Sequence, residues 1–322
     1  MPSHSSTLSL STCWLAYRHT DGYGLIQEVK ALGFSHVELS HGFKPSLVPG
    51  VLRAYDEGLI SVTSIHNFCP TPPGPYSLSP NLYKPSSTRI SERSAWIRYT
   101  KATLDFAARL NVKAVVCHLG SVGFFWSYPL KPLKKYLEAS QGTNYLKDPT
   151  FIQLRDKALL KIRKRKPGYW ENTLLALAEV VPYAKANGVC LCFEVRESLD
   201  ELPLDEDFIS LFNHFSDSEA CGYWHDIGHA QIKHLMGVID HRTHVQGLKS
   251  RTVGFHLHDV TANLKDHQEI GTGTVDFSLL KDYAKPSDFL VLELSPSLSQ
   301  EAVLRSKPVS YTHLTLPTNR EV

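Results

Sequence analysis

The sequence predicts an α/β protein folded as a (β/α)8 barrel. Short strand-like runs alternate with amphipathic helical runs, and eight such strands can be counted along the 322 residues. The strands are apolar along nearly their whole length, which is typical of a parallel sheet covered on both sides. An open doubly wound sheet is the alternative, but it favours a glycine-rich phosphate loop after an early strand, and the sequence has none.

The elements of the first half follow in order from local patterns. Each early strand is apolar, and each early helix has apolar residues at helical spacing and closes on a glycine such as Gly33 or Gly58. The proline-rich segment 67–85 predicts an irregular loop. The expected elements are a strand at 8–14, a helix at 22–33, a strand at 35–40, a helix at 48–58, a strand at 59–66, a helix at 89–111 and a strand at 112–120.

The second half continues the same alternation. The helix that ends at Gly188 contains Pro182, which predicts a kink or a break. The expected elements are a helix at 171–188, a strand at 189–194, a helix at 205–215, a strand at 220–226, a helix at 229–237, a strand at 253–260, a helix at 276–284, a strand at 288–295 and the start of a helix at 297–307.

Two segments depart from the barrel pattern. Residues 121–168 form an insertion after the fourth strand that looks partly helical, on the side of the barrel where loops set substrate choice. Its aromatic run FFWSYP (124–129) would stack on a sugar ring, cap the pocket or belong to a small packed subdomain. Residues 308–322 resemble a non-native, adaptor-derived tail, so we expect the barrel to span 1–307, with its last helix stopping at Pro308 and incomplete.

Composition limits the class of protein. With 42% hydrophobic residues and a formal net charge of +2, the chain is an ordinary globular protein, and near-neutrality argues against nucleic acid as a partner. The basic run 161–167 is interpreted as a solvated helix face. No apolar run reaches the roughly 20 residues that span a bilayer, and no signal peptide is recognised. Six cysteines without a CxxC pair favour a reducing, cytoplasmic location.

The candidate functional residues lie at the ends of the predicted strands. Nearly every predicted strand finishes in His, Asp or Glu, and in a barrel these ends converge on the mouth where active sites are built. Buried carboxylates and imidazoles are costly unless they are paired or bind a metal. This mixture of ligands favours Mn²⁺, Zn²⁺ or Co²⁺ over Ca²⁺. The residues in question are Glu38, His41, His66, His118, Glu194, Asp226, His229, His256, His258, Asp259 and Glu293.

Seven motifs together resemble the xylose isomerase-like TIM-barrel superfamily, which includes sugar isomerases and epimerases and the endonuclease IV type of nuclease. They lie between Leu8 and Pro296. The motifs are GFSHVELSHG, CHLGS, CFE, HDIGH, GFHLHD, HQEIGTGTVDF and LELS. The resemblance implies one metal bound by residues of the fifth to eighth strands. Those residues are Glu194, Asp226, His256 and Glu293.

The same resemblance implies further binding residues. His229 matches a histidine that touches substrate in epimerases and binds a further metal in the nuclease. His66, His118 and His267 match additional ligands of the nuclease. The nuclease has an aspartate two residues before the histidine that His267 matches. This chain has Lys265 at that position, and the neighbouring Asp266 could substitute for the aspartate.

Each candidate also has a structural interpretation. Glu194 and Glu293 would each belong to a buried ion pair with a cationic side chain, Asp226 would cap a helix, and the histidines would be hydrogen-bonded core residues. Arg196 is a candidate for holding a phosphate or carboxylate of the substrate. Other residues are expected to be structural. His225 and His258 should face away from the site, the GTG run 271–273 should be a turn, and His36, His41, His234, His241 and His244 should lie on the surface or in loops.

The sequence is compatible with three hypotheses for the function, two enzymatic and one of ligand binding alone. In the preferred one, Glu194 and Glu293 exchange a proton with a sugar or sugar derivative held at a divalent metal, as an isomerase or epimerase does. The alternative is a phosphodiesterase related to endonuclease IV that uses two or three metals. A barrel that binds ligand without catalysis would have lost some of the four main metal-binding residues. The expected partner is a small molecule, and the sequence leaves a homo-oligomer open.

Overall fold

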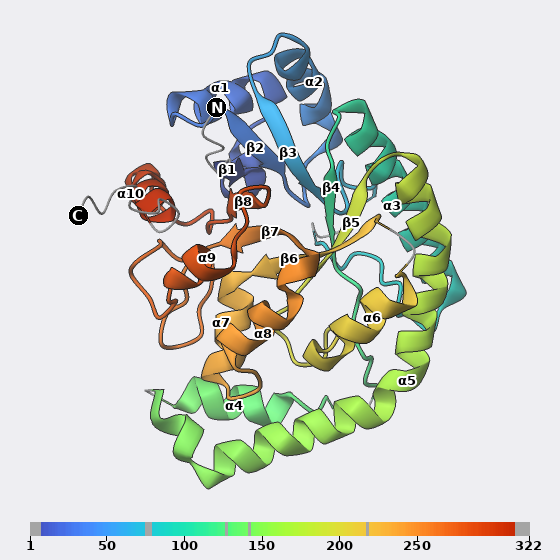
Figure 1. Cartoon of the computed structure of the whole chain (residues 1–322), viewed down its shortest axis with the longest axis vertical. Coiled ribbons are helices and arrows are strands. Elements are labelled where there is room, and N and C mark those ends of the chain that lie inside the picture. Colours follow the sequence, from blue (N-terminus) through green and yellow to red (C-terminus); the bar gives the residue numbers. More distant parts are fainter. Residues whose placement is uncertain (1–7, 75–78, 126–127, 141–142, 217–218, 313–322) are drawn as a thin grey trace, which may run out of the picture.

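The computed structural model describes residues 8–74, 79–125, 128–140, 143–216 and 219–312. Its eight strands form a closed parallel barrel in which each strand pairs with its neighbours in sequence, and β1 closes the barrel against β8 (Figure 1). At the closure Leu10 of β1 lies opposite Val37 on one side and Leu292 on the other. The predicted (β/α)8 barrel is therefore confirmed.

The strands overlap their predicted ranges and are mostly shorter. The first ends at Ser11, because a turn of 3-10 helix at Thr12–Trp14 follows it at once. The strands are β1 Leu8–Ser11, β2 His36–Leu39, β3 Ser61–His66, β4 Ala114–Cys117, β5 Cys190–Glu194, β6 Cys221–Asp226, β7 Thr252–Leu257 and β8 Phe289–Leu292.

Ten α-helices surround the barrel in the part of the chain described. One of them, α8, was not predicted, because HRTHVQGL has few apolar residues and contains a glycine; the Asp240 side chain caps its first turn by accepting from the Thr243 N–H at 2.8 Å. The helices are α1 Gly22–Ala31, α2 Val48–Asp56, α3 Ile90–Arg109, α4 Lys131–Ala139, α5 Pro149–Ala186, α6 Phe208–His214, α7 Ile227–Leu235, α8 His241–Leu248, α9 Ser278–Tyr283 and α10 Gln300–Thr312.

Helix α5 changes the expected layout of the insertion. It is a single helix of 38 residues that begins at Pro149, capped by Asp148, and continues through Pro167 and Pro182. The break expected at Pro182 is therefore wrong, and residue 168 is not an element boundary. Packing accounts for the continuity: the C-terminal half of α5 buries residues against the barrel and α3, and the N-terminal half packs on α4 (Figure 1). The partly helical character of the insertion is confirmed.

The last helix also runs farther than expected. Residues Gln300–Thr312 form α10, so the helix continues beyond Pro308 rather than stopping there. The remainder of the expected tail, residues 313–322, lies outside the described residues. The adaptor origin of residues 308–322 stays a prediction.

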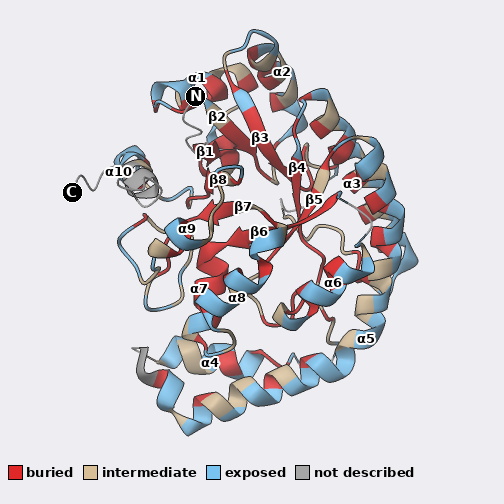
Figure 2. Cartoon of the chain, in the orientation of Figure 1, coloured by how far each residue is buried: buried red, intermediate tan, exposed pale blue. Residues whose placement is uncertain are grey.

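The core has an inner and an outer part. The larger part lies between the strands and the helices, and Figure 2 shows the strands buried over most of their length. A smaller cluster fills the inside of the barrel and is dominated by the fully buried Trp224. Gly254 makes room for that indole, since a Cβ there would lie 2.4 Å from the ring. The inside of the barrel is thus plugged below its polar mouth.

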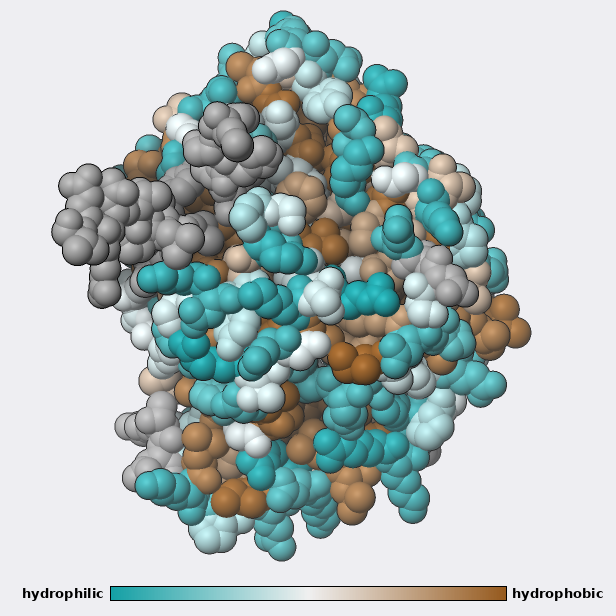
Figure 3. All heavy atoms as spheres, in the orientation of Figure 1, coloured by the Kyte–Doolittle hydropathy of each residue, from teal (hydrophilic) through white to brown (hydrophobic). Residues whose placement is uncertain are grey.

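The outer surface is mixed in polarity. Figure 3 shows hydrophilic side chains over most of this face, with hydrophobic ones between them. Among the described residues, no helix is both long and apolar enough to traverse a lipid bilayer.

Candidate functional site

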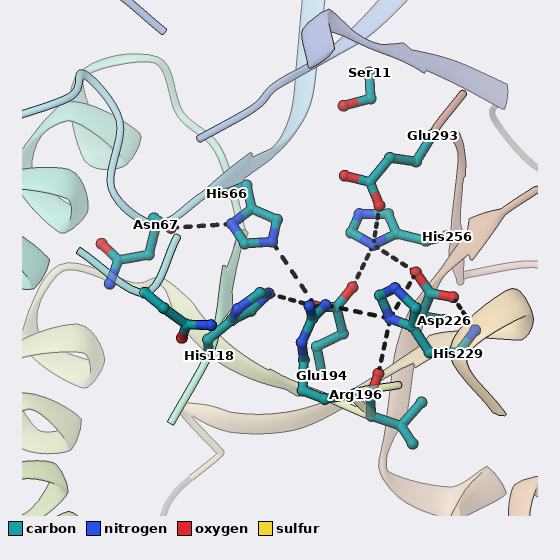
Figure 4. A network of polar contacts seen from close by, with 12 residues as sticks. Ser11, His66, Asn67, His118, Glu194, Arg196, Asp226, His229, His256 and Glu293 are labelled. Carbon is teal, nitrogen blue, oxygen red and sulfur yellow. Dashed lines mark hydrogen bonds and ion pairs between the residues drawn. The ribbon is translucent and has the colours of Figure 1, made fainter. Parts of the chain in front are cut away.

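Four side chains from the ends of consecutive strands converge at the barrel mouth (Figure 4). Their ligand atoms lie within 4.8 Å of one another. The group consists of Glu194, Asp226, His256 and Glu293. Nδ1 of His256 is at its centre, 2.7 Å from Glu194 Oε1, 3.0 Å from Glu293 Oε2 and 3.7 Å from Asp226 Oδ2. The four residues predicted as the main metal ligands are therefore brought together.

The donor set and its charges fit a divalent cation. Three carboxylates and one imidazole are buried here, and Oδ2 of Asp226 accepts no hydrogen bond from any described residue. Burial lowers the pKa of His256, but Glu293 and Glu38 outweigh it, so the net pKa is raised well above the ordinary value. The negative charge of the surrounding carboxylates therefore favours a cation at His256, either a proton or a metal ion. The mixture of oxygen and nitrogen ligands suits Mn²⁺, Zn²⁺ or Co²⁺.

A second group adjoins the first on the side of β3 and β4. His118, just after β4, places Nε2 2.7 Å from Glu194 Oε2, and His66 at the end of β3 places Nε2 3.9 Å from the same oxygen. Burial and the nearby Arg196 lower the pKa of His118 to about 4, so it is a neutral base at physiological pH. Burial also opposes the charge on His66, but Glu194 raises its pKa.

Arg196 occupies the space between these groups and α7. Its Nη1 donates to Glu194 Oε2 at 2.7 Å and lies 3.2 Å from Nδ1 of His229. Burial raises the pKa of Glu194, but Arg196 and the neighbouring histidines hold it well below the ordinary value. Arg196 thus neutralises a site carboxylate within the chain, and its contact with a substrate anion stays a prediction.

A third group lies on the side of α7 and the loop after β7. His229, His258 and His267 bring their ring nitrogens within 4.8 Å of one another. The rings of His258 and His267 stack at a centroid distance of 4.2 Å. Asp266 lies beside them, with Oδ1 3.2 Å from His267 Nδ1 and Oδ2 3.7 Å from His229 Nε2. The expected substitution of Asp266 for the aspartate replaced by Lys265 is thus sterically available.

The expectation that His258 faces away from the site is wrong. Its Nε2 lies 2.9 Å from Asp226 Oδ1. The sequence contained the signal, because residues two apart in a strand share a face, and His256 and His258 are two apart. His225 does face outward as expected, with Nε2 3.0 Å from Nε2 of His241 and Nδ1 2.9 Å from the Tyr223 hydroxyl.

Two histidines assigned to the surface or to loops, His241 and His244, are placed differently. His41 lies in the turn after β2 as expected, partly buried, with its ring 5.0 Å from that of His66. Burial, together with His66, lowers its pKa to about 3. His241 is buried and places Nδ1 3.0 Å from Gln231 Oε1, and the His244 ring lies against Tyr223, with Nε2 3.0 Å from its hydroxyl. Sequence reasoning missed them because the two α8 histidines belong to a helix it did not predict.

The mouth opens into a cavity of about 380 Å³. Glu293 lies at its inner end, and His41, Tyr17, Lys265 and His267 are among its walls. This volume lies in the range of small-molecule sites, roughly 300–1,000 Å³. A smaller cavity of about 210 Å³ lies under α4, lined by leucines together with Glu197 and Asp266. Asp266 lines both cavities, so the insertion borders the site as expected.

Two other expectations concern loops. The GTG run is a turn as expected, and the N–H groups of Gly271 and Gly273 donate to the buried Asp259 carboxylate at 2.9 and 2.8 Å. Those amides therefore already have an anionic partner. In the aromatic run 124–129, Phe124 and Tyr128 form a ring pair at 6.4 Å, while residues 126 and 127 lie outside the described residues.

A comparison with protein families agrees with the barrel fold. The model of the xylose isomerase-like TIM barrel family matches residues 26–305. The chain belongs to this family. No curated protein matches it in sequence. The family therefore accounts for the barrel fold.

Solved structures with the same fold include several members named as sugar epimerases. An L-ribulose 3-epimerase has a TM-score of 0.66 at 15% identity, with 96% of this chain and 94% of that chain covered. A D-tagatose 3-epimerase-like protein has 0.64 at 17%, covering 96% and 97%. The D-psicose 3-epimerase of Clostridium cellulolyticum H10 has 0.64 at 13%, covering 96% and 100%. At these identities the likeness shows the fold.

Proposed function

We propose that this protein is a metal-dependent isomerase or epimerase of a sugar or sugar derivative. The observation that carries the proposal is the convergence of three carboxylates on His256 Nδ1, beside a cavity that one of them, Glu293, lines. A bound Mn²⁺, Zn²⁺ or Co²⁺ ion would be held by Glu194, Asp226, His256 and Glu293. The sugar epimerases that share the fold support this class of substrate.

The chain's own residues divide the proton transfer. A divalent metal polarises the carbonyl and hydroxyl oxygens of a bound sugar and so acidifies the C–H between them. Glu293 lines the cavity and takes that proton, because its carboxylate faces the substrate space. Glu194, held by Arg196 and His118, delivers a proton taken up from solvent to the neighbouring carbon or the opposite face. Glu293 releases its proton to solvent, so that both carboxylates are regenerated. His229 and His267 hold substrate hydroxyl groups at the side of the site.

A second candidate is a phosphoester hydrolase that uses two or three metals. The two additional groups of potential ligands favour it: His66 and His118 with Glu194, and His229 with His258 and His267. The position of Arg196 weighs against it, because the guanidinium 2.7 Å from Glu194 Oε2 repels a second cation at the oxygen that the first of these groups would share. The near-neutral chain also argues against DNA as the substrate.

Exchange of a substrate hydrogen with solvent tests the isomerase without knowing the sugar. The metal-loaded protein is incubated in D₂O with a panel of ketoses and aldoses, and C–H signals are followed by NMR. We expect exchange next to a carbonyl, its loss with a chelator, and a decrease of about 10²–10⁴-fold in Glu293→Gln. The control is Glu206→Gln, whose carboxylate pairs with Arg163 on the surface. Metal-dependent phosphodiester cleavage without such exchange would establish the hydrolase instead.

A further inference from the structure

Glu38 is a fully buried carboxylate of the site for which the proposed reaction has no role. It lies near the end of β2, on the opposite side of the His256 ring from the three carboxylates that surround Nδ1. The register of β2 against β3 shifts at this point, so that Glu38 pairs with Ser64 rather than Thr63. Such a bulge beside a site re-aims a side chain.

Three groups donate to this carboxylate. The hydroxyl of Ser11 on β1 is 3.0 Å from Oε1, and that of Ser64 on β3 is 2.7 Å from Oε2. Nε2 of His256 is 3.2 Å from both oxygens. A buried carboxylate is very costly unless it is both hydrogen-bonded and paired with a positive charge, and the two serines supply hydrogen bonds but no charge. The cationic partner of Glu38 is therefore His256, or a metal acting through it.

Both ring nitrogens of His256 face carboxylates, but the two surroundings differ. Nδ1 lies among three carboxylates, Glu194, Glu293 and Asp226, which together could hold a metal ion in place of a proton on that nitrogen. Nε2 faces only the two oxygens of Glu38, which accept hydrogen bonds, so it would keep its proton when a metal binds Nδ1. Histidines that bind metals commonly donate their other N–H to a carboxylate, which fixes the ring and raises its basicity.

We propose that Glu38 is a positioning residue of the metal centre, fixing His256 in the Nε2-protonated form so that Nδ1 binds the metal. The inference rests on the proposed metal-dependent function and extends it to a residue on the first half of the barrel. Glu38 thus acts through His256 and does not itself touch substrate. Because Ser11 and Ser64 hold it in place, β1, β2 and β3 contribute to a metal site whose ligands all come from β5 to β8.

The test measures metal affinity and not turnover. The full chain is stripped of metal, and Co²⁺ binding is followed by its visible absorption in competition with a chelator. We expect the dissociation constant to rise about 10–100-fold in Glu38→Gln and at least as much in Glu38→Leu, with a changed Co²⁺ spectrum. The matched control is Asp288→Asn, which removes an equally buried carboxylate just before β8, at the other end of the barrel. It should leave the constant within about twofold.

The outcomes separate this inference from the proposed function. If the parent binds Co²⁺ and folded Glu38→Gln binds it equally well with the same spectrum, Glu38 has no positioning role. An equal loss in Asp288→Asn also overturns the inference. A parent that takes up no metal removes the proposed function and this inference together. If Glu38→Gln does not fold, imidazole ¹⁵N NMR of the metal-loaded parent decides, since a proton on Nδ1 of His256 contradicts the inference.

Discussion

A Cβ atom added to Gly228 would lie 2.0 Å from Cε1 of His258. Gly228 is in the first turn of α7, two residues after Asp226, and its missing side chain lets the imidazole lie against the helix and reach that carboxylate at 2.9 Å. The glycine of the HDIGH motif is therefore explained by close packing. It allows a strand end and a helix start to share one polar cluster.

Gly228→Ala should consequently displace His258. We expect a loss of about 1–3 kcal/mol in the free energy of unfolding, typical of overpacking, together with weaker metal binding. Urea unfolding and metal titration measure the two effects. The control is Gly247→Ala in α8, where a Cβ meets nothing within 4 Å and helix propensity should raise stability by up to about 1 kcal/mol. Equal stability of the two variants would contradict this account of Gly228.

The charge on Arg196 should limit the number of metals. In Arg196→Met, Glu194 Oε2 loses its cationic partner and becomes available with His66 and His118. We expect metal content, measured by elemental analysis, to rise from one to two ions per chain. Arg163→Met, which removes a surface arginine paired with Glu206, should stay at one. A parent that already holds two ions would show that Arg196 does not exclude the second.

Asp259 should control the loop that follows β7. Its carboxylate accepts from the backbone N–H groups of Val260, Gly271, Gly273 and Val275 at 2.8–3.1 Å. In Asp259→Asn an amide N–H₂ must face some of these donors, and we expect a cost of about 1–3 kcal/mol. Hydrogen exchange should accelerate in residues 267–275. Asp276→Asn, at an exposed carboxylate, is the comparison and should leave that exchange unchanged.

The buried histidines of α8 should make the protein sensitive to acid. Burial lowers the pKa of His241 to about 3 and that of His244 to about 4, against about 6.5 in an unfolded chain. The unfolded state therefore binds protons first, so stability is fully present above about pH 6.5 and falls as the pH drops toward the folded values.

The expected loss from His241 alone is about 2 kcal/mol between pH 7.5 and 5. Urea unfolding at these two pH values should show a smaller difference for His241→Gln than for the parent. His214→Gln, at an exposed histidine of α6, should keep the full difference. A parent whose stability does not change over this range would contradict the assignment of His241 as a neutral, buried residue.

The barrel and its central ligands could be predicted because both depend on local order in the chain. Apolar strands that end in a carboxylate or imidazole specify the mouth, so Glu194 at the end of β5 and Glu293 after β8 could be placed on two sides of one metal site. The orientation of individual side chains and the length of helices were harder to predict from the sequence. The inward direction of the His258 side chain follows from the two-residue periodicity of a strand, which puts it on the same face as His256. Continuity of α5 through Pro167 depends on packing against α3 and α4, and propensity alone does not reveal such contacts.

The length of α5 separates two kinds of change that a protein lineage can make. At about 1.5 Å per residue, its 38 residues span roughly 57 Å, far more than the barrel wall requires. Its C-terminal half is tied to the barrel, while its N-terminal half carries α4 out along the lower edge of the molecule (Figure 1). Substitutions on that outer arm can reshape the rim beside Asp266 without moving a strand. Helix α4 and the N-terminal half of α5 are therefore suitable positions for directed evolution of substrate preference.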